Sequence, residues 1–148
     1  MKAKKILFPS DFSHTGDAAL DMATALARDT GATLIIAHVE ELATAYGAGE
    51  FYYGVVEPVT DDLRRMLEEI KPTDPAVPYE HRLITGEPAP AIVRLATEED
   101  VDMIVLGTHG RTGLSRLVMG SVAEAVVRRA KCPVLTFKQP AAQLAGSK

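Results

Sequence analysis

The chain has 148 residues, of which 47% are hydrophobic and 24% are charged, and its formal net charge is −4. Its length is that of one ordinary domain, and its composition is typical of a soluble globular protein. The mild acidity excludes a general nucleic-acid-binding protein, which needs a broad basic surface. No apolar run in the sequence has membrane-spanning length, and the run at 6–8 is too short for a signal-peptide core. We therefore expect a cytoplasmic protein that does not contact membranes.

Short apolar runs alternate along the chain with segments of helical periodicity. The expected strands are 5–8, 32–39, 79–84, 101–106 and 134–137. The helices between them are expected to bury residues at helical spacing: Ala19, Met22, Ala23 and Leu26 in the first, Val59, Leu63, Met66, Leu67 and Ile70 in the second, Ile92, Leu95 and Ala96 in the third, and Val122, Val126 and Val127 in the fourth.

The ends of these helices carry their own signals. Asp11 and Ser13 are candidate caps for the first helix, and Gly31 is placed to end it. Asp61 and Asp62 are expected in the first turn of the second helix, where the macrodipole favours them. Pro88 suits the first turn of the third helix.

The resulting order, βαβαβαβαβ, predicts an α/β fold with a parallel sheet that helices cover on both faces. We expect a single domain at 1–138, followed by a poorly ordered tail at 139–148, because the tail residues are mostly small and polar. Cys132 is the only cysteine in the sequence, which excludes an intramolecular disulfide.

A glycine-bearing loop, Gly107 to Ser121, lies between the fourth strand and the fourth helix. It holds Arg111, Arg116 and His109 but no carboxylate, so its charge is opposite to that of the whole chain. Glycines let a backbone approach phosphates closely, and amides at a helix N-terminus bind anions. Two interpretations stay open on glycine content alone: a phosphate-binding loop, or a wide turn whose glycines only satisfy backbone geometry.

The spacing Gly107-x2-Gly110-x9-Gly120-Ser121 resembles the ATP-binding signature of the universal stress protein family. The segments 9–11 (Pro-Ser-Asp) and 132–135 (Cys-Pro-Val-Leu) also resemble that family, and the likeness extends from about Lys4 to Lys138. It implies a doubly wound, Rossmann-like sheet of five strands in the order 3-2-1-4-5. Ligands bind such sheets outside the carboxyl ends of the strands where the strand order reverses, here between strands 1 and 4.

The resemblance also implies roles for individual residues in this crevice. The residues that match family contacts to phosphate and ribose are Gly107, Gly110, Gly120 and Ser121, with the amide of Val122 beside them. Asp11 matches a contact to the nucleoside, Val39 matches a position whose backbone contacts the adenine edge, and Pro9 lies at the same crevice. Arg111 is a candidate for added positive charge. The alternatives are that Asp11 and Ser121 are ordinary helix caps and that the loop arginines are only solvated.

The function that follows is a regulatory, stress-response protein that binds an adenine nucleotide, ATP or else ADP or AMP, with Mg²⁺ bridging the phosphates. Two alternatives stay open: a slow ATP hydrolase or phosphoryl-transfer enzyme, and a dimeric interaction module without nucleotide. No general base and nucleophile pair is evident in the sequence, so we expect no catalytic residues and at most slow turnover. The four histidines, His14, His38, His81 and His109, lack the spacing of metal ligands, and no metal-binding side chains are assigned.

Assembly is the last expectation. An unprotected apolar edge strand tends to pair with another chain, and the family resemblance implies a homodimer through the last strand, at Val134, Leu135 and Phe137. The glycine-rich stretch 46–53 contains three tyrosines and is compatible with a lid over the base, a partner surface or local packing.

Overall fold

The computed structural model of the chain describes residues 2–13, 16–41, 56–108 and 120–138. These residues form the strands β1 Lys5–Pro9, β2 Thr33–Glu40, β3 Tyr79–Thr85, β4 Met103–Gly107 and β5 Val134–Phe137. The helices that alternate with them are α1 Asp17–Thr30, α2 Val56–Glu68, α3 Pro88–Glu98 and α4 Ser121–Arg129. The predicted alternation of strand and helix is confirmed. The predicted tail, 139–148, and the tyrosine-containing stretch lie outside the described residues.

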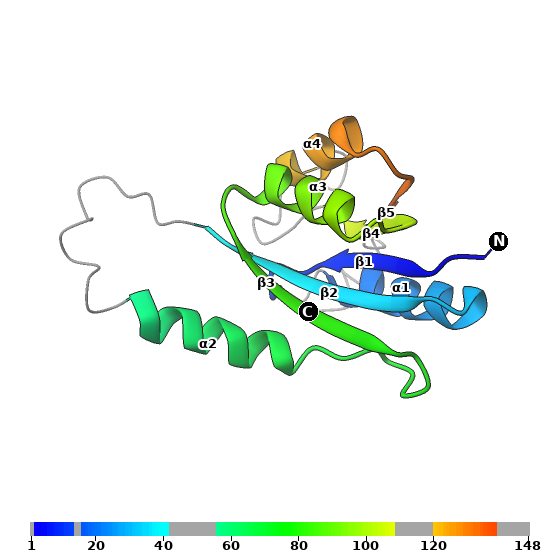
Figure 1. The fold of residues 1–148 in the computed structure, drawn as a ribbon, viewed down its shortest axis with the longest axis horizontal. Helices are drawn as coiled ribbons and strands as arrows, with labels where there is room; N and C mark the ends of the chain where they lie inside the picture. The colour runs from blue at the N-terminus through cyan, green and yellow to red at the C-terminus, as the bar shows by residue number, and fades with distance from the viewer. Residues whose placement is uncertain (1, 14–15, 42–55, 109–119, 139–148) are drawn as a thin grey trace, which may run out of the picture.

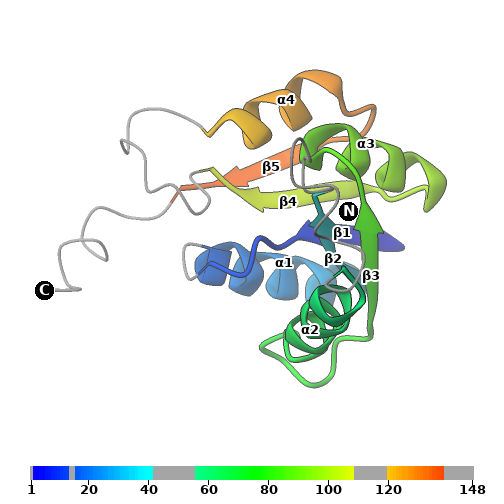
Figure 2. The ribbon, with the colours of Figure 1, turned by 90° about the vertical axis from the view of Figure 1, so that its left-hand side faces the viewer.

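The strands form one parallel sheet in the order β3-β2-β1-β4-β5. The first strand of the sequence therefore lies at the centre, and the chain reverses its direction across the sheet between β1 and β4. Right-handed crossovers then require α1 and α2 to lie on one face and α3 and α4 on the other. Figures 1 and 2 show this three-layer arrangement. The predicted doubly wound fold is confirmed.

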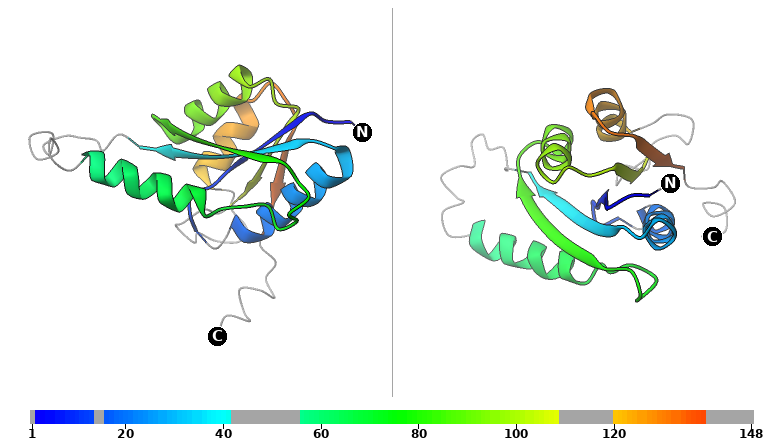
Figure 3. Two further views of the ribbon diagram at one scale, coloured as in Figure 1. Left: turned by 60° about the horizontal axis from the view of Figure 1, so that its bottom comes forward. Right: turned by 45° about the vertical axis from the view of Figure 1, so that its right-hand side comes forward.

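Both faces of the sheet are packed against helices, which is why its strands are apolar on both sides. Residues 34–39 of β2 are all buried. The cluster on the α3–α4 side includes Leu7, Ile35, Ile104, Leu95 and Val126. The cluster on the α1–α2 side includes Ile6, Phe8, Leu34, Val105 and Leu67. The right-hand view of Figure 3 shows the two helix pairs on opposite sides of the sheet.

Two predicted helix ends are confirmed. Gly31 follows α1 with φ of 81°, a left-handed conformation that glycine adopts without steric strain, and its amide donates to the Ala27 carbonyl. Pro88 begins α3, where its missing N–H removes no helical hydrogen bond. Among the described residues, no helix combines the length and the apolarity needed to cross a membrane.

Several details of the predicted helices are wrong. Residue Gly16 occupies the N-cap position of α1, so Asp11 and Ser13 do not cap that helix. Helix α2 begins at Val56, several residues earlier than predicted, which places Asp61 and Asp62 beyond its first turn. The inner face of α4 is formed by Ala123 and Val126. Two of the valines predicted for this face, Val122 and Val127, are instead 39% and 45% exposed, and Met66 of α2, which was also expected to be buried, is 45% exposed.

The amino edge of the sheet is closed by hydrogen bonds to the start of β1. One carboxylate oxygen of Asp102 accepts hydrogen bonds from the amides of Lys4 (2.7 Å) and Lys5 (3.0 Å). The Lys5 ammonium group lies 3.2 Å from the Glu99 carboxylate, whose other oxygen accepts a hydrogen bond of 3.0 Å from Arg82. Strand β1 is thereby tied to the segment that joins α3 to β4.

These contacts lower the pKa values of both carboxyl groups below their ordinary values. For Asp102 the main cause is the hydrogen bond from the Lys5 amide, followed by that from Lys4. For Glu99 the main cause is the hydrogen bond from Arg82, followed by that from Lys5. Both groups are therefore held in their charged form by the fold.

Candidate functional site

At the carboxyl edge of the sheet, the pairing of β1 with β4 ends before the pairing of β1 with β2. The β1–β2 ladder runs on to the pair Pro9–Ala37, whereas the last pair of the β1–β4 ladder is Leu7–Ile104. Near its end, β1 is thus still paired with β2 but no longer with β4. This divergence lies at the point where the strand order reverses, which is where open α/β sheets bind ligands.

Pro9 explains why the ladder to β4 ends early. Successive residues of a strand direct their N–H and C=O groups to opposite neighbours. The Lys5 carbonyl accepts a hydrogen bond from the Asp102 amide at the start of β4, so residues 5, 7 and 9 face β4. Proline has no N–H, and at position 9 it removes the donor that the next bond to β4 requires.

The end of β2 directs backbone groups at the same opening. The Ser10 amide donates to the Ala37 carbonyl at 2.7 Å, so Ala37 faces β1. The Gly86 amide donates to the Glu40 carbonyl on the opposite, β3 side. By alternation, the N–H and C=O of Val39 point to the side of β1, beyond the residue where β1 ends. The Val39 side chain is buried in the cluster on the α3–α4 side.

The turn after β1 is held by a compact set of hydrogen bonds. One oxygen of the Asp11 carboxylate, Oδ1, accepts hydrogen bonds from the Ser13 amide (2.9 Å) and the Ser13 hydroxyl (2.5 Å). The Phe12 amide donates to the Ser10 hydroxyl oxygen at 3.1 Å. Among the described residues both hydrogen bonds to Asp11 use Oδ1, so within that part of the chain its Oδ2 keeps its acceptor sites.

Phe12 has φ of 67°, which is a strained conformation for a bulky residue. Its ring stacks on the buried His38 ring with centroids 3.9 Å apart, and His38 Nδ1 lies 2.7 Å from the Ser10 carbonyl oxygen. Strain of this kind persists only where surrounding contacts enforce it, and it concentrates at functional sites. The stacking of Phe12 on His38 was not predicted, because nothing in the sequence signals a left-handed phenylalanine.

The residues on either side of the loop between β4 and α4 are hydrogen-bonded to each other. Gly107 is the last residue of β4, and the next residue, Thr108, accepts a hydrogen bond of 2.5 Å from the Gly120 amide. The predicted site residues Gly110 and Arg111, and also His109 and Arg116, lie outside the described residues. Gly120 has φ of −63° and ψ of 154°, which any residue adopts. The interpretation that the loop glycines only satisfy backbone geometry is therefore wrong for Gly120, and any need for glycine there must come from the close approach of another group.

The first backbone amides of α4 have no hydrogen-bond acceptor within their own helix. Residue Gly120 is the N-cap, so the alternative of Ser121 as an ordinary cap is wrong. The first helical hydrogen bond runs from the Glu124 amide to the Gly120 carbonyl, and within the described part of the chain no side chain caps the amides before it. The amides of Ser121 and Val122 are thus oriented to receive an anion. Glu124 is ion-paired with Arg128, which offsets its negative charge in the first turn.

The fold is that of a doubly wound α/β protein, in which β1 and β4 separate where the strand order reverses. A model of the universal stress protein family matches residues 2–138. Universal stress protein MJ0531 of Methanocaldococcus jannaschii is 33% identical over 141 residues, which cover 93% of this chain and 83% of the relative. The chain belongs to the universal stress protein family.

Solved structures agree with this assignment. The structure of protein MJ0577, which is 32% identical, covers 95% of this chain and 99% of its own and superposes with a TM-score of 0.83. A universal stress protein in complex with cAMP is 26% identical, covers 95% and 100% of the two chains and has a TM-score of 0.63. The sheet order and layers described above are therefore those of solved members of the family.

Proposed function

We propose that the protein binds an adenine nucleotide, ATP in the first place, in the crevice between β1 and β4 and acts as a regulatory member of its family. The observation that carries the proposal is the opening between β1 and β4. Three kinds of group border this opening: the backbone of Val39, the carboxylate of Asp11 and the first amides of α4. The relative solved with cAMP supports an adenine nucleotide as the class of ligand.

Each part of a nucleotide has a matching group in this arrangement. The adenine edge carries a donor and acceptors, which suit the N–H and C=O of Val39. The ribose hydroxyls are donors that suit the Oδ2 atom of Asp11. The phosphates suit the amides of Ser121 and Val122 at the positive end of α4. The Gly120 amide already donates to Thr108, so in this scheme Gly120 contributes space rather than a hydrogen bond.

Mg²⁺ completes this proposal as the ion that bridges the nucleotide phosphates. It keeps several waters in most protein sites and is held largely by the phosphates themselves. Its role would be to neutralise phosphate charge. The loop residues Gly110 and Arg111 are proposed to contact the same phosphates, as the family resemblance implies.

Nucleotide occupancy is tested with Asp11→Ala, and Asp21→Ala, an exposed position on α1, is the matched control. Mass spectrometry of nucleotide released from the purified parent protein identifies the resident ligand. Calorimetry should show that Asp11→Ala weakens ATP and adenosine alike by about tenfold, because hydrogen bonds to a charged group contribute about 1.5–3 kcal/mol. Unchanged ATP affinity in a folded Asp11→Ala protein would remove Asp11 from the site. A parent protein that binds no adenine nucleotide would overturn the proposed function.

We further propose a homodimer that pairs β5 strands across a two-fold axis. Strand β5 is at the edge of the sheet, and Leu135 is 37% exposed there. Phe137 packs against the core on the α1–α2 side, so a charge at Phe137 would also disturb the fold. Leu135→Lys is the cleaner variant, and light scattering should show that it converts dimer to monomer. A parent protein that is monomeric at high concentration contradicts this pairing.

A further inference from the structure

One buried side chain, that of His38 on β2, lies between the two segments that are proposed to hold the nucleoside. Only 7% of its surface is exposed. Leu34 and Ile36 alternate with it along the strand and are buried in the cluster on the α1–α2 side, so the His38 ring points to that face. The next residue along β2 is Val39, whose backbone is proposed to contact the adenine edge.

The His38 ring contacts the turn after β1 on both sides of Asp11. Its Nδ1 atom lies 2.7 Å from the Ser10 carbonyl oxygen. A carbonyl oxygen only accepts hydrogen bonds, so Nδ1 carries the proton and donates. The same ring stacks on the Phe12 ring with centroids 3.9 Å apart and an angle of 24° between the ring planes. The two residues that flank Asp11 are thus both held by one side chain.

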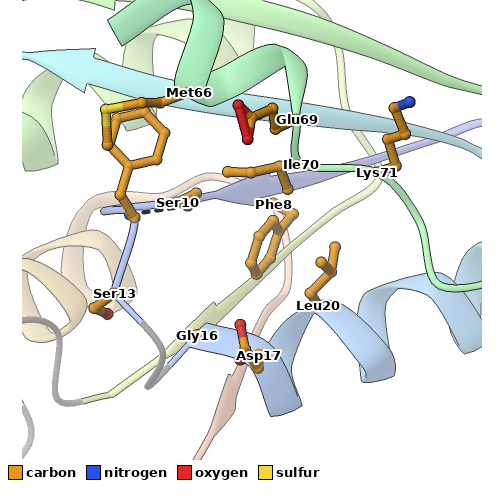
Figure 4. A pocket seen from close by; sticks show the side chains of 11 residues that line it. Phe8, Ser10, Ser13, Gly16, Asp17, Leu20, Met66, Glu69, Ile70 and Lys71 are labelled. Atoms are coloured by element: carbon orange, nitrogen blue, oxygen red, sulfur yellow. Dashed lines mark hydrogen bonds between the residues drawn. The ribbon is translucent and has the colours of Figure 1, made fainter. Parts of the chain in front are cut away.

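The turn depends on such contacts because a cavity lies behind it. Ser10, Phe12 and Ser13 line this cavity, which has a volume of about 390 Å³. Figure 4 shows Ser10 and Ser13 at its border. Phe12 also has the left-handed φ of 67°, which is unfavourable for a bulky residue. A turn with an unfavourable backbone angle beside a cavity relaxes unless specific contacts hold it, and the contacts with His38 do so.

We propose that His38 is a positioning residue for the nucleoside half of the nucleotide site and acts through Asp11 without touching the ligand. The inference rests on the proposed function, in which Asp11 receives the ribose hydroxyls and the Val39 backbone receives the adenine edge. His38 is covalently joined to Val39 and holds both neighbours of Asp11. It therefore fixes the distance between the two nucleoside contacts before the ligand arrives, and contacts fixed in advance lose less conformational entropy on binding.

The first test is His38→Asn, with adenosine as the probe. The asparagine amide nitrogen is as many bonds from Cα as Nδ1, so it keeps a donor for Ser10 and removes only the ring. Calorimetry should show that adenosine binds about two- to tenfold more weakly, the cost of ordering one side chain on binding. The amide NMR spectrum of the variant verifies that it is folded.

His81→Gln is the matched control. His81 Nε2 also lies 2.7 Å from a backbone carbonyl oxygen, that of Ile70, and its ring also contacts an aromatic ring, that of Tyr79. His81 is on β3 and is not part of the proposed site, so adenosine affinity should be unchanged. An equal loss in the two histidine variants means that any such histidine supports the fold, and overturns the proposal.

A double-mutant cycle separates positioning from a general loosening of the protein. If His38 acts through Asp11, His38→Asn should have no further effect on adenosine affinity in a protein that already carries Asp11→Ala. The same loss with and without the Asp11 carboxylate would show that His38 acts by another route, and overturns the proposal.

Phe12→Asn provides a second variant if His38→Asn does not fold. Asparagine tolerates the left-handed conformation better than other non-glycine residues, so the backbone angle becomes more favourable while the ring contact is lost. Adenosine should again weaken about two- to tenfold. Full affinity in this variant, beside a loss in Asp11→Ala, overturns the role of His38 alone. A parent protein that binds no adenosine overturns the proposed function as well.

Discussion

The amino and carboxyl edges of the sheet are formed by opposite ends of the same strands, and they differ in how those ends are hydrogen-bonded. At the amino edge, Asp102 accepts hydrogen bonds from the amides of Lys4, just before β1, and Lys5, its first residue, and Glu99 joins Lys5 to Arg82. At the carboxyl edge, Pro9 lacks the donor that would continue the bonding to β4, and the two central strands separate. The amino edge therefore secures the fold, and the carboxyl edge leaves the backbone groups to which we propose that the nucleotide binds. Changes at the two edges should therefore have separable effects.

The largest expected effect is at the carboxyl edge, in Gly120→Val. The backbone at Gly120 is in the extended region that valine favours, so folding should be unaffected. The valine side chain would occupy the space proposed for phosphate and weaken ATP at least tenfold, or about 1.4 kcal/mol, with a smaller effect on adenosine. Calorimetry with both ligands measures this pattern.

Ala130→Val is the matched control, since Ala130 follows the other end of α4 with nearly the same backbone angles, φ of −65° and ψ of 145°. It should leave ATP affinity unchanged. If Gly120→Val binds ATP as tightly as the parent, the carboxyl edge is not the phosphate site, and the proposed functional difference between the two edges is wrong.

The next effect is at the amino edge, in Asp102→Ala. Two amide hydrogen bonds to an exposed carboxylate are lost, and the free energy of unfolding should fall by about 1 kcal/mol. Denaturant titration measures this loss. ATP affinity should not change, because Asp102 lies at the opposite edge from the proposed site. Asp102→Asn, which keeps an acceptor oxygen, should retain part of the stability.

The smallest effect is the acid dependence of the same edge. The unfolded pKa values are about 3.9 for aspartate and about 4.3 for glutamate, and folding lowers the pKa values of Asp102 and Glu99. Their contribution to stability is thus present above about pH 4 and is lost as the pH falls through the lower folded values. Thermal unfolding at decreasing pH should show a shallower loss for the double variant Asp102→Asn, Glu99→Gln. Parallel curves for variant and parent contradict this assignment.

Much of the fold follows from local signals in the sequence. Apolar runs flanked by breakers predicted all the strands to within two residues, and Gly31 and Pro88 marked helix ends correctly, because their backbone requirements are local. The start of α2 was missed because charged residues in its middle were taken for its first turn. Burial of α4 was misjudged because three valines fit one helical stripe about as well as the alanine and single valine that are buried.

The candidate site was predictable in its position more than in its details. Strand alternation and the reversal point bring Pro9, Val39 and Gly107 to one edge, as the resemblance implied. The particular hydrogen bonds depend on non-local geometry. The Gly120 amide bonds to Thr108, and the Phe12 ring rests on His38, which is distant in the sequence. No periodicity or motif encodes such contacts.

Pro9 makes the opening between β1 and β4 a covalent property of the chain. An ordinary residue at this position would carry an N–H able to extend the ladder, and a ligand would then have to compete with that bond. Because proline has no N–H, that bond to β4 cannot form whether or not a ligand is present. The proposed site is in this sense preorganised. The two strands would not have to separate when the nucleotide binds, so little binding energy would be spent on reshaping the protein.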